Sequence, residues 1–183
     1  MAASSSTPRR TDLRTIALWR GINVGKAKRL AMADLKALLA ELGATNVATL
    51  LNSGNAVFDT RRKLTADRIR AAVLERLGVD AAVIVKTADE WAAIAASQPI
   101  AEADDASRLL VAVTGDAATL QAVAGIATQG DERLVVTAHA AYLWCAHGIL
   151  ESKAGVALLK RLGEAGTTRN WATVEKLRVL ALA

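Results

Sequence analysis

Residues 15–26 read TIALWRGINVGK, an apolar run that passes at Arg20 into a loop with two glycines, an asparagine and a lysine. The apolar run has the length and the residue types of a buried strand. Glycines let the backbone of the loop approach a ligand closely, so Arg20, Asn23 and Lys26 are candidates to bind an anion. The loop differs from a Walker A phosphate loop, which spaces its glycines one residue further apart and carries a hydroxyl residue after the lysine.

The pattern on the C-terminal side of this loop predicts one β-α-β-β-α-β unit. Leucines at helical spacing follow the loop up to Gly43, and Thr65 caps a second helix that Gly78 ends. We expect strands near 14–20, 47–51, 56–58 and 81–86, and helices near 30–42 and 65–77. This order is the ferredoxin-like, or split βαβ, arrangement.

The second half repeats the order β-α-β-β-α and adds a helix at the C-terminus. We expect strands near 109–114, 134–137 and 142–146, and helices after Asp116, after Ser152 and over 171–182. The chain is therefore predicted to be α+β, with two ferredoxin-like (α-β plait) subdomains, antiparallel sheets and a C-terminal helix. We place the subdomains at 13–98 and 106–183, after a disordered tail over 1–12.

Composition bounds the class of protein. The chain has 183 residues, of which 52% are apolar and only 3% aromatic, so Ala, Val, Leu and Ile must build its core. A formal net charge of +5 permits a polyanionic partner without requiring one. The single cysteine, Cys145, cannot form an internal disulfide, and we expect a buried thiol. No apolar run approaches the ~20 residues of a membrane span, and the N-terminus lacks the apolar part of a signal peptide, so we predict a cytoplasmic protein without a membrane partner.

A second polar cluster, Asn52-Ser53-Gly54-Asn55, lies between the second and third predicted strands. As a hairpin turn it needs no further function, because asparagine and glycine suit the positive φ angles of tight turns. Its amides and hydroxyl can also bind phosphate or carboxylate oxygens, which keeps Asn52, Ser53 and Asn55 among the candidate ligand residues. We expect the first and third strands to be parallel, which places this turn at the opposite end of the sheet from loop 20–26.

Two clusters in the second half complete the set of candidates. Arg169 offers a bidentate anion donor, either Thr168 or Asn170 suits the cap of the last helix, and Trp171 is either a core residue or a stacking face. Lys153 stands at a predicted helix start, where it is either a surface lysine or an anion contact. Because topology separates loop 20–26 from the first-half turn, we expect Arg169 and Asn170 to lie beside that loop.

Several kinds of active site lack their residues in this sequence. The two histidines have no clustered acids or thiols, so no metal site is predicted. There is no carboxylate pair and no Ser-His-Asp set, so the sequence indicates no cofactor and leaves open whether the protein is an enzyme. The basic runs at 26–29 and 61–63 are either solvated or phosphate contacts, and the sheet aromatics of an RNA-recognition motif are missing apart from Phe58.

Four ordered motifs of the chain resemble those of the DUF1697 family of bacterial proteins, whose function is unknown. The family's strand ending in Leu-Arg-Gly-Ile-Asn-Val-Gly corresponds to 18–25, and its Gln-Ser-Gly-Asn-Val-Val-Phe corresponds to 52–58, with Asn in place of Gln. Its Gly-Ile-x-x-Ser-Lys corresponds to 148–153, and its Thr-x-Arg-Asn-Trp-x-Thr-Val-x-Lys-Leu to 167–177. The resemblance covers nearly all of 16–180 and implies a fold of two ferredoxin-like subdomains, with no catalytic role for any residue.

The sequence leaves three functions open. In the first, the protein binds a phosphorylated or otherwise anionic small ligand through loops 20–26 and 167–171, as a binding protein or as an enzyme. In the second, it is a nucleic-acid-binding module that uses its sheets and its positive charge. In the third, the polar motifs form an internal hydrogen-bond network that joins the two halves, as buried and fully bonded Asn and Arg side chains would indicate. The ligand and the oligomeric state stay open.

Overall fold

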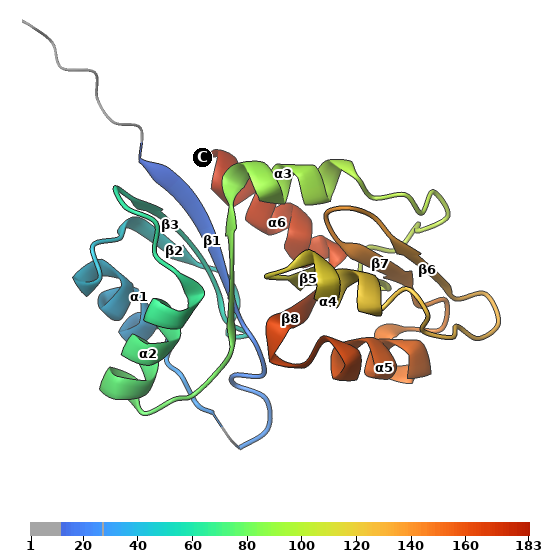
Figure 1. The fold of residues 1–183 in the computed structure, drawn as a ribbon, viewed down its shortest axis with the longest axis horizontal. Coiled ribbons are helices and arrows are strands. Elements are labelled where there is room, and N and C mark those ends of the chain that lie inside the picture. The colour runs from blue at the N-terminus through green and yellow to red at the C-terminus, as the bar shows by residue number, and fades with distance from the viewer. Residues whose placement is uncertain (1–11, 27) are drawn as a thin grey trace, which may run out of the picture.

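Two four-stranded antiparallel sheets form the framework of the protein (Figure 1). The computed structural model describes residues 12–26 and 28–183, and the expected tail over 1–12 lies almost entirely outside these residues. The first sheet has the strand order β2-β3-β1-β4 and the second has the order β6-β7-β5-β8, so the two halves arrange their strands in the same way. The predicted α+β fold of two ferredoxin-like halves is confirmed.

The first half contains the predicted elements in the predicted order. Its strands are β1 (Leu13–Trp19), β2 (Thr45–Thr49), β3 (Asn55–Thr60) and β4 (Val83–Thr87), and its helices are α1 (Met32–Glu41) and α2 (Ala66–Leu77). The Thr65 side chain caps α2, and Gly78 closes that helix in the left-handed conformation. Thr87 and Glu90 form a capping box at the start of α3 (Ala88–Ala96), the helix that leads into the second half.

The second half contains one strand more than the sequence predicts. Its elements are β5 (Leu109–Thr114), α4 (Ala117–Ala122), β6 (Arg133–Val136), β7 (Ala141–Trp144), η1 (Ile149–Glu151), α5 (Lys153–Leu162), η2 (Gly163–Ala165), β8 (Gly166–Asn170) and α6 (Trp171–Leu182). The extra strand, β8, pairs with β5 along its whole length. Its sequence, GTTRN, lacks the apolar residues by which a strand is recognised, and we therefore interpreted it as a loop before the last helix.

The expectation that the first and third strands run parallel is wrong. β1 and β3 are antiparallel neighbours, with Leu18 opposite Asn55 and Leu13 opposite Thr60. The helix α1 returns the chain so that β2 runs in the direction of β1, and the turn into β3 then reverses it. The turn before β3 therefore lies at the same end of the sheet as the loop after β1.

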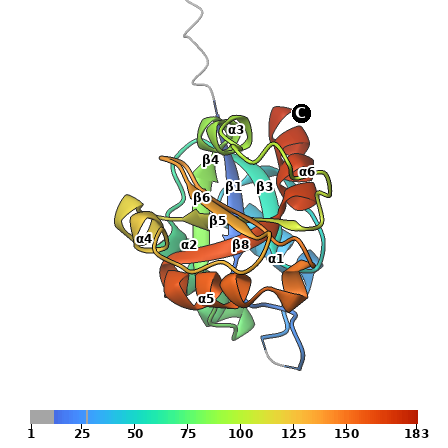
Figure 2. The same cartoon turned by 90° about the vertical axis from the view of Figure 1, so that its right-hand side faces the viewer.

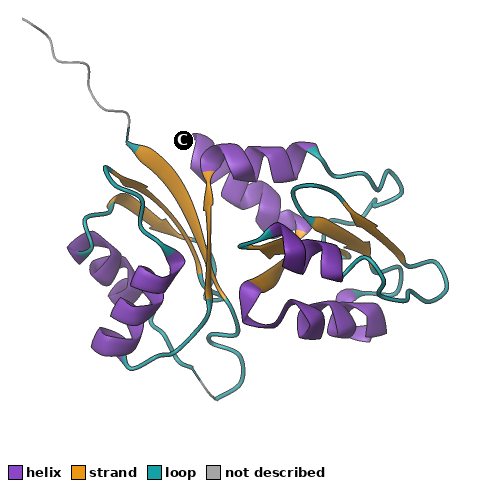
Figure 3. Cartoon of the chain, viewed as in Figure 1, coloured by secondary structure: helices purple, strands orange, loops and turns teal. Residues whose placement is uncertain are grey.

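Three apolar cores hold the layers together. The helices α1 and α2 cover the outer face of the first sheet, and α4 and α5 cover the outer face of the second (Figure 3). The inner faces of both sheets share a central core with α3 and α6, in which Trp91, Tyr142, Val174 and Leu177 are buried. Figure 2 shows the strands of the second sheet crossing in front of those of the first. Because both halves contribute to one core, they pack as a single unit.

Cys145 is buried and forms no disulfide, and burial raises the pKa of its thiol, as expected for a cysteine that packs in a core. No helix in the described part of the chain is both long and apolar enough to cross a membrane. Within the same residues, no group of His, Cys, Asp and Glu side chains comes together in a way that could hold a metal ion.

Candidate functional site

Arg169 of β8 lies at the centre of the contact between the two halves. Its Nε donates to Asn55 Oδ1 at 2.6 Å. Its Nη2 donates to the backbone oxygens of Trp19, at 2.8 Å, and Gly54, at 3.0 Å. Its Nη1 donates within its own strand, to Thr167 Oγ1 at 3.0 Å. One side chain of the second half thus binds both the last residue of β1 and the turn before β3, whereas we expected Arg169 beside loop 20–26 and apart from this turn.

The charge of Arg169 is solvated by neutral oxygens. The residue is only 9% exposed, and burial lowers its pKa to about 10, so the guanidinium is still cationic at neutral pH. Over the residues that the structure describes, no ion pair includes Arg169. A buried cation without these acceptors is very costly, and burying the acceptors without a donor also has a smaller cost. The buried guanidinium and the oxygens of the turn therefore each stabilise the buried position of the other.

Asn55, the first residue of β3, is fully buried and uses its whole side chain within the protein. Its Nδ2 donates to Leu50 O at 2.8 Å and to Ser53 Oγ at 3.1 Å, while its Oδ1 accepts from Arg169. These bonds close the turn on itself and fix it to the second half. Asn55 and Arg169 meet the condition that we set for an internal network, namely buried polar side chains with every group bonded.

A second arginine joins the end of β1 to the second half. Arg20 donates from Nη1 to Gly166 O at 3.0 Å and from Nη2 to Leu159 O at 2.8 Å. Burial lowers the pKa of Arg20, and the nearby carboxylate of Glu164 partly offsets this shift. Glu164 itself accepts a hydrogen bond from Arg70 at 2.8 Å, which lowers the pKa of this exposed carboxyl. The junction between the halves therefore has a buried part and a solvated edge.

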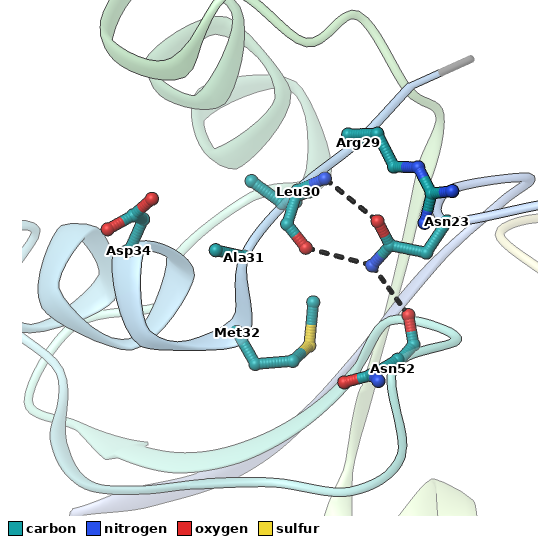
Figure 4. Close-up of a pocket in the computed structure, with 7 residues that line it drawn as sticks. All are labelled: Asn23, Arg29, Leu30, Ala31, Met32, Asp34 and Asn52. Atoms are coloured by element: carbon teal, nitrogen blue, oxygen red, sulfur yellow. Dashed lines mark hydrogen bonds between the residues drawn. The ribbon is translucent and has the colours of Figure 1, made fainter. Parts of the chain in front are cut away.

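Asn23 ties the loop after β1 to the turn before β3 (Figure 4). Its Oδ1 accepts from Leu30 N at 2.9 Å, and its Nδ2 donates to Leu30 O at 2.8 Å and to Asn52 O at 2.7 Å. Asn23 has a φ of 56°, a left-handed conformation that asparagine adopts more readily than most residues. The sequence interpretation, which separated the loop from the turn, is therefore corrected: the two touch directly.

A pocket of about 510 Å³, which we call the α1 pocket, opens between this loop, the turn and the start of α1. It is lined by Asn23, Arg29, Leu30, Ala31, Met32, Asp34 and Asn52 (Figure 4). Ala31 precedes the helix and offers no side-chain cap to its N-terminus. The first backbone N–H groups of a helix have no acceptor within the helix, so this end of α1 favours an anion.

The remaining candidates have other surroundings. Lys26 is exposed on the loop itself, and Ser53 is exposed on the turn, where its Oγ accepts from Asn55. Lys153 is exposed at the start of α5. Asn170 caps α6 by accepting from Thr173 N at 3.0 Å, and the partly buried Trp171 packs against the central core. These last two side chains therefore serve the packing of α6, and only Arg169 of that cluster reaches the end of β1, next to the loop.

The lining of the α1 pocket includes residues that sequence reasoning passed over. Arg29 appeared only as one of a basic run, and Met32 and Asp34 appeared only as part of a helix. A signal was present in Ala31, because a helix that starts after a residue without a side-chain oxygen leaves its first N–H groups available. No sequence pattern, however, shows that the turn at Asn52 closes the other side.

The sheets offer no open face for stacking nucleic-acid bases. In both sheets the outer strand faces are covered by helices, and the inner faces belong to the shared central core. Phe58, the one sheet aromatic of the third strand, is fully buried. RNA-recognition motifs stack bases on exposed aromatic residues of a sheet, and the two sheets within the described residues do not present such a surface.

Comparison with known families agrees with the sequence resemblance. The model of a family described as "Protein of unknown function (DUF1697)" matches residues 13–143. The chain belongs to the DUF1697 family. The matched range includes the loop after β1 and the turn before β3, whereas the motifs at 148–153 and 167–177 follow it in the sequence.

Comparison with solved structures supports the fold of this DUF1697 protein. The chain is similar to the conserved bacterial protein SP0830 from Streptococcus pneumoniae, with a TM-score of 0.78 and 20% sequence identity. The similarity covers 93% of this chain and 99% of that one, so it extends through both halves. A search of curated proteins finds no match. Any activity must therefore be argued from the site itself.

Proposed function

We propose that this DUF1697 protein binds a small phosphorylated or otherwise anionic molecule in the α1 pocket. The observation that carries the proposal is the uncapped start of α1, which lines the pocket together with Arg29 and Asn52. Backbone N–H groups at a helix start and a guanidinium are both donors to phosphate and carboxylate oxygens. The lining holds one carboxylate, from Asp34, which Figure 4 shows on the far side of the pocket from Arg29.

Some side chains of the loop and the turn contact the ligand, and others hold these segments in place. Arg29 and the side chain of Asn52 face the ligand, and the exposed Lys26 adds positive potential from the same loop. Asn23 is a positioning residue, because its amide is already bonded to Leu30 and to the backbone of Asn52. Binding, rather than catalysis, is the function that this set of side chains supports.

The second half contributes to the site through Arg169 and Arg20, without itself touching the ligand. Arg169 holds Trp19 O and the turn, and Arg20 holds the end of β1 to the second half. The segment 167–171 therefore acts by fixing the geometry of the pocket. A ligand that meets a preformed pocket loses less affinity to ordering of the protein.

A phosphate titration followed by ¹⁵N–¹H correlation spectra tests the proposal residue by residue. Inorganic phosphate is expected to shift the backbone amides of Met32 and Ala33 and the side-chain amide of Asn52. Arg29→Gln is expected to raise the Kd for phosphate by about tenfold, the loss of one charge-assisted contact of roughly 1.5 kcal/mol. Lys36→Gln is the matched control, because Lys36 is an exposed cation of α1 outside the pocket lining.

Two outcomes would contradict the proposal. One is a wild-type spectrum in which the start of α1 does not respond to phosphate at concentrations up to about 10 mM, a range that detects even weak binding. The other is an equal loss of affinity in the Arg29 and Lys36 variants, which would show that net charge alone attracts the anion.

A further inference from the structure

A second pocket lies at the other end of the first sheet, where β1 begins and β3 ends. We call it the basic pocket; its volume is about 470 Å³. It is lined by Asp12, Leu42, Gly43, Thr45, Thr60, Arg61, Arg62, Lys63, Leu64 and Arg68. The strand β3 starts at Asn55, beside the α1 pocket, and ends at Thr60, in the basic pocket. The two pockets therefore lie at opposite ends of the sheet and have no lining residue in common.

The basic pocket concentrates positive charge. Arg61, Arg62, Lys63 and Arg68 line it, against the single carboxylate of Asp12. None of these cations forms an ion pair with any of the residues that the structure describes. Some cations elsewhere on the surface do have carboxylate partners, at Glu41, Asp80, Glu90, Asp105, Glu102 and Glu175 among others, whereas others, such as Lys36 and Lys160, have none among the described residues. A cluster of unneutralised cations around a concave site attracts anions strongly.

The floor of the basic pocket contains a buried hydroxyl without a partner. Thr60 is 4% exposed, and its Oγ1 makes no hydrogen bond within the described residues. Because this oxygen has almost no accessible surface, it is enclosed by the protein and is not itself a contact for a ligand in the pocket. At the neighbouring helix start, Thr65 caps α2 by accepting from Arg68 N, so this N–H is already bonded. The side chains themselves make this site.

We propose that the basic pocket binds a small molecule that carries linked phosphate groups, such as a pyrophosphate moiety. A single phosphate cannot neutralise three arginines and a lysine, whereas a diphosphate group presents more charge and more oxygens within the same volume. The pocket is of the size that binds small ligands and lies in a recess of the domain rather than along an extended surface. This site is independent of the function proposed for the α1 pocket.

Calorimetric titration with inorganic pyrophosphate tests this inference, with orthophosphate as the second probe. Pyrophosphate is expected to bind the wild type more tightly than orthophosphate does. The double variant Arg61→Gln, Arg62→Gln is expected to raise the Kd for pyrophosphate at least about tenfold. The matched control is Lys36→Gln, Lys160→Gln, which removes the same charge from exposed residues outside both pockets. All four substitutions are at exposed positions, so the variants should fold.

The same titrations contain the results that would overturn the inference. An equal loss of affinity for pyrophosphate in the control double variant would show that net charge alone, and not the basic pocket, attracts the anion. Loss of pyrophosphate binding in Arg29→Gln, with the Arg61 and Arg62 variant unaffected, would assign the ligand to the α1 pocket instead. If a single-stranded oligonucleotide binds in an Arg61- and Arg62-dependent way and pyrophosphate does not, the surface is a nucleic-acid contact and the small-molecule proposal fails.

Discussion

Lys86 and Arg169 occupy the same position in the two sheets, as the fourth residues of β4 and β8. Lys86 pairs with Ile16 of β1, Arg169 pairs with Val111 of β5, and both partners belong to the central core. Lys86 keeps its charge within its own half, in an ion pair with Glu90 at 3.7 Å. Arg169 instead donates across the junction to the first half. The two halves repeat the same backbone arrangement, but the cation at this position bonds within its own half in one case and across the junction in the other.

The two halves also differ in the length of the loop that follows their first strand. Residues 20–31 separate β1 from α1, whereas only residues 115–116 separate β5 from α4. The longer loop forms one wall of the α1 pocket, and the polar strand β8 supports that loop from the second half. The first half therefore carries the α1 pocket, and the second half holds the end of β1 and the turn beside it. Substitutions at the junction between the halves test this difference between them.

The largest expected effect is that of Arg169→Met. The substitution removes the donor from Trp19 O and from Asn55 Oδ1 while these atoms stay buried, and it removes one of two donors to Gly54 O, which also accepts from Trp19 N. We expect it to lower the free energy of unfolding by about 3–5 kcal/mol, because two buried acceptors lose their partner at once and a third loses one of its two bonds. Urea denaturation at neutral pH measures the loss.

Lys86→Met is the matched control for Arg169→Met, because it changes the equivalent residue in the other sheet. Its partner Glu90 is about half exposed, at 53%, so we expect a loss of about 0–1 kcal/mol. Equal losses in the two variants would show that the two cations have the same role and would remove the basis of the comparison.

The second-largest expected effect is that of Asn55→Ala, which removes the side-chain hydrogen bonds that close the turn. The variant loses the bonds to Leu50 O and Ser53 Oγ and leaves the Nε of Arg169 without its acceptor. We expect a loss of about 2–3 kcal/mol. Combined with Arg169→Met, the loss should fall short of the sum by at least about 1 kcal/mol, since the two side chains share one network. Additive losses would mean that they act independently.

The smallest effect concerns the solvated edge of the junction. The Arg70 hydrogen bond lowers the pKa of Glu164, so this pair stabilises the folded state above the ordinary titration range of a glutamate. The contribution is lost as the pH falls through the lowered pKa. Glu164→Gln should therefore lower the free energy of unfolding slightly at pH ~7 and by less near pH ~3. Added salt should reduce the difference in stability between the variant and the wild type at pH ~7.

Urea midpoints at the two pH values measure this effect of Glu164. Asp131→Asn serves as its control, because Asp131 is an exposed carboxylate for which the structure gives no ion pair among the described residues. A loss in Glu164→Gln that is the same at both pH values, or that Asp131→Asn reproduces, would show that the ion pair across the junction contributes nothing.

Sequence reasoning found the elements that carry local signals. Thr65 and Asp116 each cap the helix that was expected to follow them, and the apolar runs of β1 and β5 mark them as strands. It failed at β8, whose five residues GTTRN contain no apolar side chain. That strand is set by pairing with β5 and not by its own composition, so no local pattern could reveal it.

The candidate site was only partly predictable, because its contacts are long-range. Arg169 was expected beside loop 20–26, and it bonds to Trp19, the residue before that loop, and to the turn that was expected elsewhere, whereas Asn170 serves as the cap of α6. The bond between Arg169 and Asn55 joins residues that are 114 apart in the chain. The error in the direction of β3 moved the turn to the wrong end of the sheet. Neither motif shows, by its residues alone, that its polar side chains are buried and bonded to each other.

The most direct test of the account is native-state hydrogen exchange of Arg169→Lys. Lysine keeps the charge but lacks the planar fork that reaches Asn55 and Trp19 O together. We predict that the amides of Trp19 and Leu50, which bond across the turn, exchange at least about tenfold faster, while Lys86→Arg leaves them unchanged. Unchanged exchange at Trp19 and Leu50, or an acceleration spread evenly over both sheets, would contradict the claim that Arg169 holds the loop and the turn of the first half.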